Sequence, residues 1–78
     1  MFELGAVLSM KHKNRRGLNR IRVYGSEWEV VEDMGDSVRL KPLAEPYTSL
    51  YTIRIMLKEN DPCWEVRSSS SLRRVIEQ

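Results

Sequence analysis

The sequence predicts an all-β protein, a small antiparallel barrel of five or six strands. Runs rich in β-branched and aromatic residues are separated by turn-forming residues, as in hairpins. At two of these turns, one strand register places the apolar residues on a single face. A chain of 78 residues buries only a modest core, and closure into a barrel would remove the exposed edges of such a small sheet.

The first predicted strand spans residues 2–10, where every second residue is apolar: Phe2, Leu4, Ala6, Leu8 and Met10. Leu4, Val7 and Leu8 would also suit a short helix. Gly5 favours the strand, because an interior glycine costs a helix about 1 kcal/mol relative to alanine. The polar segment 11–19, with Asn14 and Gly17 as turn formers, is expected to be a loop.

The first predicted hairpin turns at Gly25-Ser26, a pair that suits a type II′ turn. With Tyr24 opposite Glu27, Val23 faces Trp28, Arg22 faces Glu29 and Ile21 faces Val30. This register places Ile21, Val23, Trp28 and Val30 on one face and the charged residues on the other. A slip of one residue would oppose Ile21 to Glu29, so the apolar pattern fixes the pairing.

The second hairpin is expected to turn over residues 33–37. A loop with an even number of residues would pair Val30 with Arg39 and so place a charged residue at a core position. An odd loop pairs Val30 with Leu40 and Glu29 with Lys41, and leaves Gly35 free to adopt a positive φ. Arg22, Glu29 and Lys41 would then alternate in sign across three strands, which is typical of a solvated sheet face.

The C-terminal half predicts a connection over 43–49 and a strand whose residues Tyr51, Ile53, Ile55 and Leu57 point inward. Residues 59–62 predict a turn, and opposing Lys58 to Cys63 sets Leu57 beside Trp64 and Ile55 beside Val66. Residues 68–71 are expected to form a 3₁₀ turn, with Leu72 pointing inward, before a short final strand at 73–76. We expect a single hydrophobic core that contains Trp28, Val30, Leu40, Ile55 and Trp64.

The segments GSEWEVVE and DSVRLKP, followed by CWEV, SSSS and LRRV, resemble the SH3-like barrel group. The last three resemble the final strand, 3₁₀ turn and closing strand of such barrels. The resemblance is one of architecture. It implies a single SH3-like domain over residues 1–78, and the initial methionine suggests a complete small open reading frame.

Composition excludes several classes of protein. No run approaches the roughly 20 apolar residues of a membrane span. The charges at the N-terminus follow the apolar run, contrary to a signal peptide. The single Cys63 forms no internal disulfide, so a cytoplasmic location is expected. His12 and Cys63 lack metal-ligand spacing, and no catalytic constellation or cofactor motif is present, so we expect a protein that is not an enzyme and has no cofactor.

The net charge of +2 is slight, but its distribution is uneven: residues 11–22 contain six Lys or Arg and no acid, whereas acids cluster at 27–36. The first hypothesis is therefore nucleic-acid binding through the basic loop 11–22. The expected binding residues are Lys11, Lys13, Arg15, Arg16, Arg20, Arg22, Tyr24, Arg73 and Arg74. If the basic loop has no binding function, it is only a solvated loop whose charges keep the protein in solution.

The second hypothesis is a protein–protein interaction module that binds an acidic protein surface. The basic loop, Tyr24, Met34 and the 43–49 connection would then form the contact surface. A small phage or mobile-element protein that binds a host protein fits this class. Pairing of sheet edges into a homodimer is also compatible with the sequence.

Overall fold

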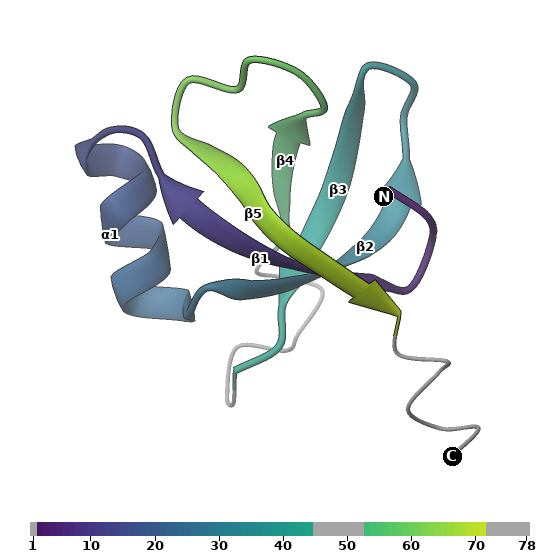
Figure 1. Ribbon diagram of the computed structural model, residues 1–78, viewed down its shortest axis with the longest axis horizontal. Helices are drawn as coiled ribbons and strands as arrows, with labels where there is room; N and C mark the ends of the chain where they lie inside the picture. The colour runs from purple at the N-terminus through teal and green to yellow at the C-terminus, as the bar shows by residue number, and fades with distance from the viewer. Residues whose placement is uncertain (1, 45–52, 72–78) are drawn as a thin grey trace.

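In the computed structural model, which describes residues 2–44 and 53–71, one antiparallel sheet curls into a half-barrel (Figure 1). Its strands lie in the order β4-β3-β2-β1-β5, and the one helix of the described residues, α1, follows β1. The elements are β1 (Ala6–His12), α1 (Arg15–Tyr24), β2 (Glu27–Asp33), β3 (Ser37–Pro42), β4 (Arg54–Leu57) and β5 (Trp64–Ser71). The all-β prediction is confirmed, and the arrangement is compatible with an SH3-like barrel.

The β2–β3 hairpin confirms the predicted pairing of Val30 with Leu40 and of Glu29 with Lys41. The extra residue, however, lies in the strand and not in the turn. The register shifts between Val30 and Glu32, so β2 contains a bulge there, and the turn itself is even. Gly35 has the expected positive φ of 95°. The apolar pattern therefore determined the register, whereas the position of the bulge left no sequence signal.

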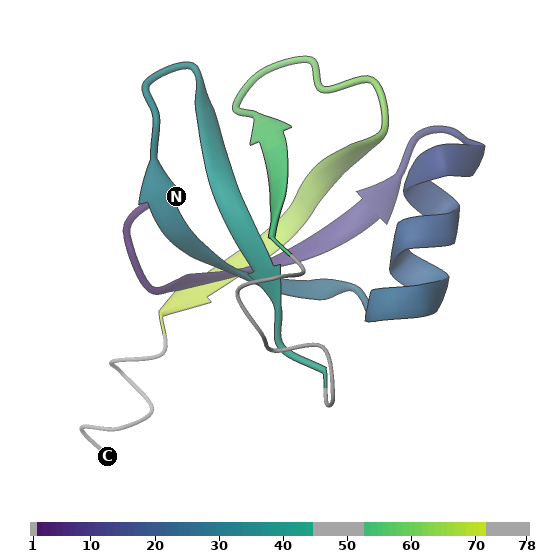
Figure 2. The same ribbon diagram turned by 180° about the vertical axis from the view of Figure 1, so that it is seen from behind.

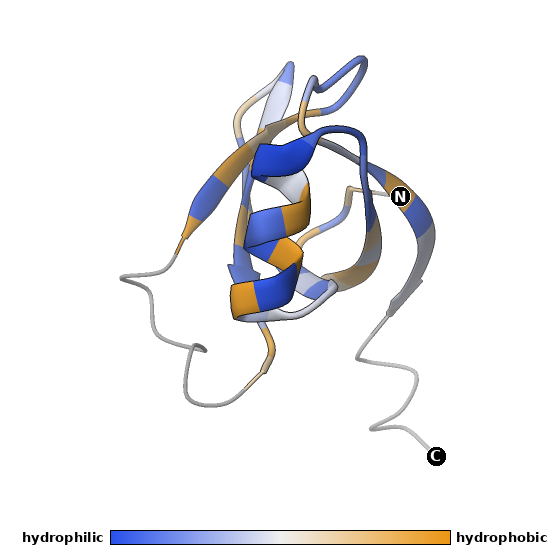
Figure 3. Cartoon of the chain, turned by 90° about the vertical axis from the view of Figure 1, so that its left-hand side faces the viewer, coloured by the Kyte–Doolittle hydropathy of each residue, from blue (hydrophilic) through white to orange (hydrophobic). Residues whose placement is uncertain are grey.

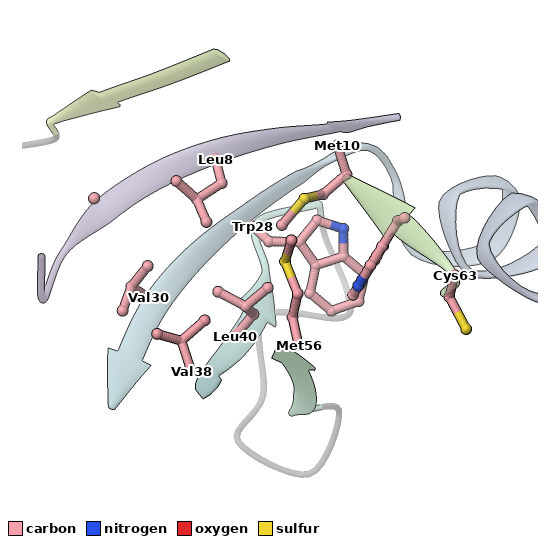
Figure 4. Close-up of a cluster of buried hydrophobic side chains, with 10 residues drawn as sticks. Leu8, Met10, Trp28, Val30, Val38, Leu40, Met56 and Cys63 are labelled. Carbon is pink, nitrogen blue, oxygen red and sulfur yellow. The ribbon is translucent and has the colours of Figure 1, made fainter. Parts of the chain in front are cut away.

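The core lies inside the curl and is built from alternate residues of the strands (Figure 4). The rings of Trp28 and Trp64 meet edge to face, with centroids 4.9 Å apart, and both residues are fully buried. The other buried core residues are Ala6, Leu8, Met10, Val30, Val38, Leu40, Met56 and Cys63. Four of the five predicted interior residues are therefore confirmed.

The first strand is shorter at its start than predicted. Its inward residues Ala6, Leu8 and Met10 are buried as the alternation indicated. Leu4, in contrast, is 62% exposed and precedes Gly5, whose φ is 85°. Gly5 therefore belongs to a turn that leads into β1 and not to the strand itself.

The predicted hairpin at Gly25-Ser26 is wrong, because residues 21–24 are helical and make no strand pairs with β2. The strand that pairs with this side of β2 is β1, with Leu8 opposite Trp28 and Val7 opposite Glu29. Arg22 therefore takes no part in the predicted row of charges. The Glu29–Lys41 pair remains, with a separation of 3.8 Å.

The predicted pairing of the strands around residues 59–62 is also wrong. These residues do form the expected turn, but β4 pairs with β3 and β5 pairs with β1. In β4 the inward residue is Met56, and Ile55 is 51% exposed, so the predicted parity is reversed.

The serines at 68–71, expected in a 3₁₀ turn, extend β5. Residues 45–52 and 72–78, including Tyr47, Tyr51, Leu72 and the predicted strand at 73–76, lie outside the described residues.

Candidate nucleic-acid interface

The helix α1 is fixed at both ends by local hydrogen bonds. At its start, the Oδ1 atom of Asn14 accepts from the Gly17 N–H at 2.9 Å, a cap typically worth about 1 kcal/mol. The amide of Asn14 also donates to the Pro62 carbonyl at 2.9 Å, which ties the helix to the β4–β5 turn. At its end, Gly25 has a φ of 89° and donates to the Ile21 carbonyl at 2.8 Å.

The inner face of α1 approaches the sheet closely at Gly17, its buried residue. A Cβ atom at Gly17 would lie 1.9 Å from the carbonyl oxygen of Cys63. The same carbonyl accepts from the backbone N–H of Lys13 at 2.7 Å. A glycine is therefore required here for close packing, and the segment leading into α1 is held by the backbone just before β5.

Two cation–π contacts complete the inner side of the helix. The guanidinium of Arg20 lies 5.3 Å from the ring centroid of Trp64. The guanidinium of Arg54 lies 5.1 Å from the ring of Tyr24 and donates to its hydroxyl at 3.1 Å. Tyr24 also packs edge to face on Trp28. Arg20 and Tyr24 are thus partly buried contacts between α1 and the barrel.

The outer side of α1 and the segment before it form a basic surface, defined by the five exposed cations Lys11, Lys13, Arg15, Arg16 and Arg22. Within residues 2–44 and 53–71, none of these five makes an ion pair within 4.0 Å. The ion pairs of this part of the chain use Arg39, Lys41 and Lys58 instead. The helix α1, which carries three of these cations, lies at one side of the sheet, beside the end of β1 (Figures 1 and 2).

The positions of the first two arginines are electrostatically unfavourable for the helix. Arg15 and Arg16 occupy the first turn, where the macrodipole and free N–H groups favour anions, and no acid is present in that turn. This hydrophilic first turn stands at one end of the helix in Figure 3. The positive end of the dipole and the two arginine charges therefore have the same sign, and both favour an anion at this end of the helix.

The structure brings together most of the sequence-predicted binding residues, although on a different element. Lys11 lies at the end of β1, and Lys13 lies between β1 and α1. The predicted loop 11–22 is therefore largely wrong, because a strand end and a helix occupy it. Arg20 and Tyr24 face the barrel and do not belong to the exposed basic surface. Arg73 and Arg74 lie outside the described residues.

Sequence reasoning missed that Asn14 and Gly17 hold α1 in place and that the exposed Asn19 lies on the helix. A helical signal was present: Leu18, Ile21 and the aromatic residue at 24 recur every three residues, after an Asn cap and before a glycine. The alternation of Ile21 with Val23 supported a strand equally well over that short span.

Other chemistry is limited in the part of the chain that the structure describes. No group of three or more His, Cys, Asp or Glu side chains there could hold a metal ion. Cys63 is a buried free thiol. The described helix is neither long nor apolar enough to cross a membrane.

No protein-family model matches the chain, and no curated protein or solved structure is significantly similar to it.

Proposed function

We propose that this protein is a non-enzymatic binding module that contacts nucleic acid through the basic surface of α1 and the segment before it. The observation that carries the proposal is that five exposed cations lie on α1 and the segment before it and make no ion pair within 4.0 Å among the described residues, although Glu65 lies opposite Lys11 across the β1–β5 pair: Lys11, Lys13, Arg15, Arg16 and Arg22. A polyanion supplies the counter-charges that this surface lacks.

The placement of Arg15 and Arg16 supports a binding role over a purely solubilising one. Cations anywhere on the surface increase solubility, but cations in the first turn of a helix oppose the macrodipole. The sequence thus accepts a local cost to stability at the place where positive charge is most concentrated. A bound phosphate would remove that cost.

The experiment is a salt titration of binding to a fluorescent duplex of about two helical turns, followed by anisotropy. If all five exposed cations neutralise phosphates, the logarithm of the binding constant falls with the logarithm of salt with a slope of about −4.5. The double substitution Arg15→Gln/Arg16→Gln should weaken binding and make the slope shallower by about 2.

The matched control is Arg39→Gln/Lys41→Gln, which removes the same charge from β3, where both residues are in ion pairs. Its salt slope should equal that of the unaltered protein. If both double substitutions weakened binding and changed the salt slope equally, binding would depend on the net charge of the protein alone. Lack of binding even at about 20 mM salt, where counterion release favours association most, would refute the proposal.

A second candidate function, recognition of a protein such as a host protein of a phage or mobile element, is favoured by a different surface. Ile55 and Leu57 of the edge strand β4 are 51% and 44% exposed, although both are large and apolar. An affinity pull-down with and without nuclease separates the two functions. A partner that survives nuclease but is lost from Ile55→Ser/Leu57→Ser supports protein recognition.

A further inference from the structure

We infer that the nucleic acid is B-form duplex DNA and that the outer stripe of α1 enters its major groove. The inference rests on the proposed function and extends it from phosphate contact to the class of ligand and the mode of contact. It is carried by three features of the structure: the shape and exposure of the helix, the residue types on its outer stripe, and the burial of the aromatic rings.

The helix has suitable dimensions and is accessible. Its 10 residues correspond to about 15 Å of length, and an α-helix with its side chains is about as wide as the major groove of B-DNA. It packs on the sheet by one face, through Gly17, Arg20 and the residues at 21 and 24, and its opposite face points away from the sheet (Figure 3). No described strand covers that outer face.

The outer stripe carries side chains that can distinguish base pairs. Arg15, Asn19 and Arg22 follow the i, i+4, i+7 spacing of a single helical face, and all three are exposed. Arginine pairs with the two acceptors of guanine in the major groove, and asparagine pairs with the donor and acceptor of adenine. Val23, 52% exposed beside this stripe, is suited to contact a thymine methyl group.

The residues before the helix are suited to a different task. Lys11 and Lys13 lie on the β1 side of the cap, outside the stripe, and both are exposed. Glu65 lies opposite Lys11 across the β1–β5 pair and offsets part of its charge. In the proposed complex the two lysines contact phosphates and set the register of the helix. The division into phosphate-contacting lysines and base-facing Arg and Asn is the one expected of a helix in the major groove.

The aromatic residues argue against a single strand. Binding of single strands relies on exposed rings on which bases stack. Trp28 and Trp64 are fully buried, and Tyr24 is covered by Arg54 and packed on Trp28, so the described surface beside α1 offers no open ring. Double-stranded RNA is disfavoured for another reason: its major groove is too deep and narrow for side chains to read.

The test compares four probes of one sequence and about 20 nucleotides per strand: duplex DNA, single-stranded DNA, duplex RNA, and duplex DNA whose cytosines are replaced by glucosylated hydroxymethylcytosine. The glucose fills the major groove but leaves the phosphates unchanged. We expect duplex DNA to bind at least about tenfold more tightly than each of the other three, the loss typical of one or more base contacts.

The outcomes separate the two proposals. Equal binding of plain and glucosylated duplexes, or of duplex and single strand, would overturn the major-groove inference and leave nucleic-acid binding intact. Polyglutamate that competes as well as the plain duplex would also overturn it, because an acidic protein surface would then suffice. Absence of binding to all four probes at low salt would refute the proposed function itself.

Asn19→Ala provides an independent readout, because Asn19 carries no charge and is exposed. Selection from a pool of random duplexes should give a preferred sequence for the unaltered protein. Asn19→Ala should lose the preference at one position, with about a tenfold loss on the preferred site and an unchanged salt slope. An unchanged preference would show that this stripe does not contact bases.

Discussion

Gly17→Ala tests whether α1 is held on the barrel by close backbone packing. On helix propensity alone, alanine in place of an interior glycine should stabilise the protein by about 1 kcal/mol. The added Cβ, however, would lie 1.9 Å from the Cys63 carbonyl oxygen, a backbone atom that also accepts the N–H of Lys13. Overpacking of this kind typically costs about 1–3 kcal/mol, and here the obstacle is not a flexible side chain.

The backbone obstacle places the cost near the upper end of this range, and the gain in helix propensity offsets about 1 kcal/mol of it. We therefore expect Gly17→Ala to lower the free energy of unfolding by about 2 kcal/mol, which corresponds to a fall in Tm of roughly 8–16 °C for a domain of this size. Urea denaturation followed by tryptophan fluorescence measures the change. Asn19→Ala, at an exposed position of the same helix, is the control and should be neutral or stabilising by a few tenths of a kcal/mol. A Gly17→Ala protein as stable as the unaltered one would refute the proposed packing of α1.

Two further predictions concern the tryptophan hydrogen bonds in the core and the stability of the fold at low pH. Trp28 donates its Nε1–H to a backbone carbonyl at 3.0 Å, whereas the Nε1–H of Trp64 has no acceptor among the described residues. We therefore expect Trp28→Phe to lower the free energy of unfolding by about 1–2 kcal/mol more than Trp64→Phe does, as measured by urea denaturation. Equal costs would contradict this. Two groups lower the pKa of the Asp33 carboxyl below its usual value of 3.8: the Gly35 N–H, which has the larger effect, and the Lys58 ammonium. Asp33 therefore stabilises the fold above pH 3.8, and this contribution is lost as the pH falls through the lowered pKa. In an NMR titration, Lys58→Met should raise the pKa only part of the way to 3.8, and a full return would assign the larger effect to Lys58.

The parts of the fold that the sequence predicted are those where burial imposes a period. Val30 and Leu40 pair as expected because a slip would turn one of them toward water. Ala6, Leu8 and Met10 alternate inward for the same reason. In β4 the residues of both faces are apolar, with Ile55 and Leu57 on one face and Met56 on the other. Hydrophobicity therefore could not decide which face points toward the core.

The candidate interface was predicted as a set of residues but not as a structure. The basic run is visible in any conformation, so Lys11 to Arg22 could be singled out from composition alone. The helix depends on contacts distant in sequence: the cap Asn14 is held by the Pro62 carbonyl, and Gly17 packs on the Cys63 carbonyl. Such contacts are absent from local patterns, and the alternation of Ile21 and Val23 competed with the helical spacing.

The change from loop to helix alters what the basic residues can do. On a loop, the arginines would have independent positions and would contribute charge without a defined spacing. On α1, Arg15 and Arg22 are fixed seven residues apart on one face with Asn19 between them. The helix is itself anchored at its start by Asn14 and at its end by Gly25. A surface fixed in this way can distinguish ligands by shape as well as by charge, which is why the comparison of plain and glucosylated duplexes is more decisive than affinity alone.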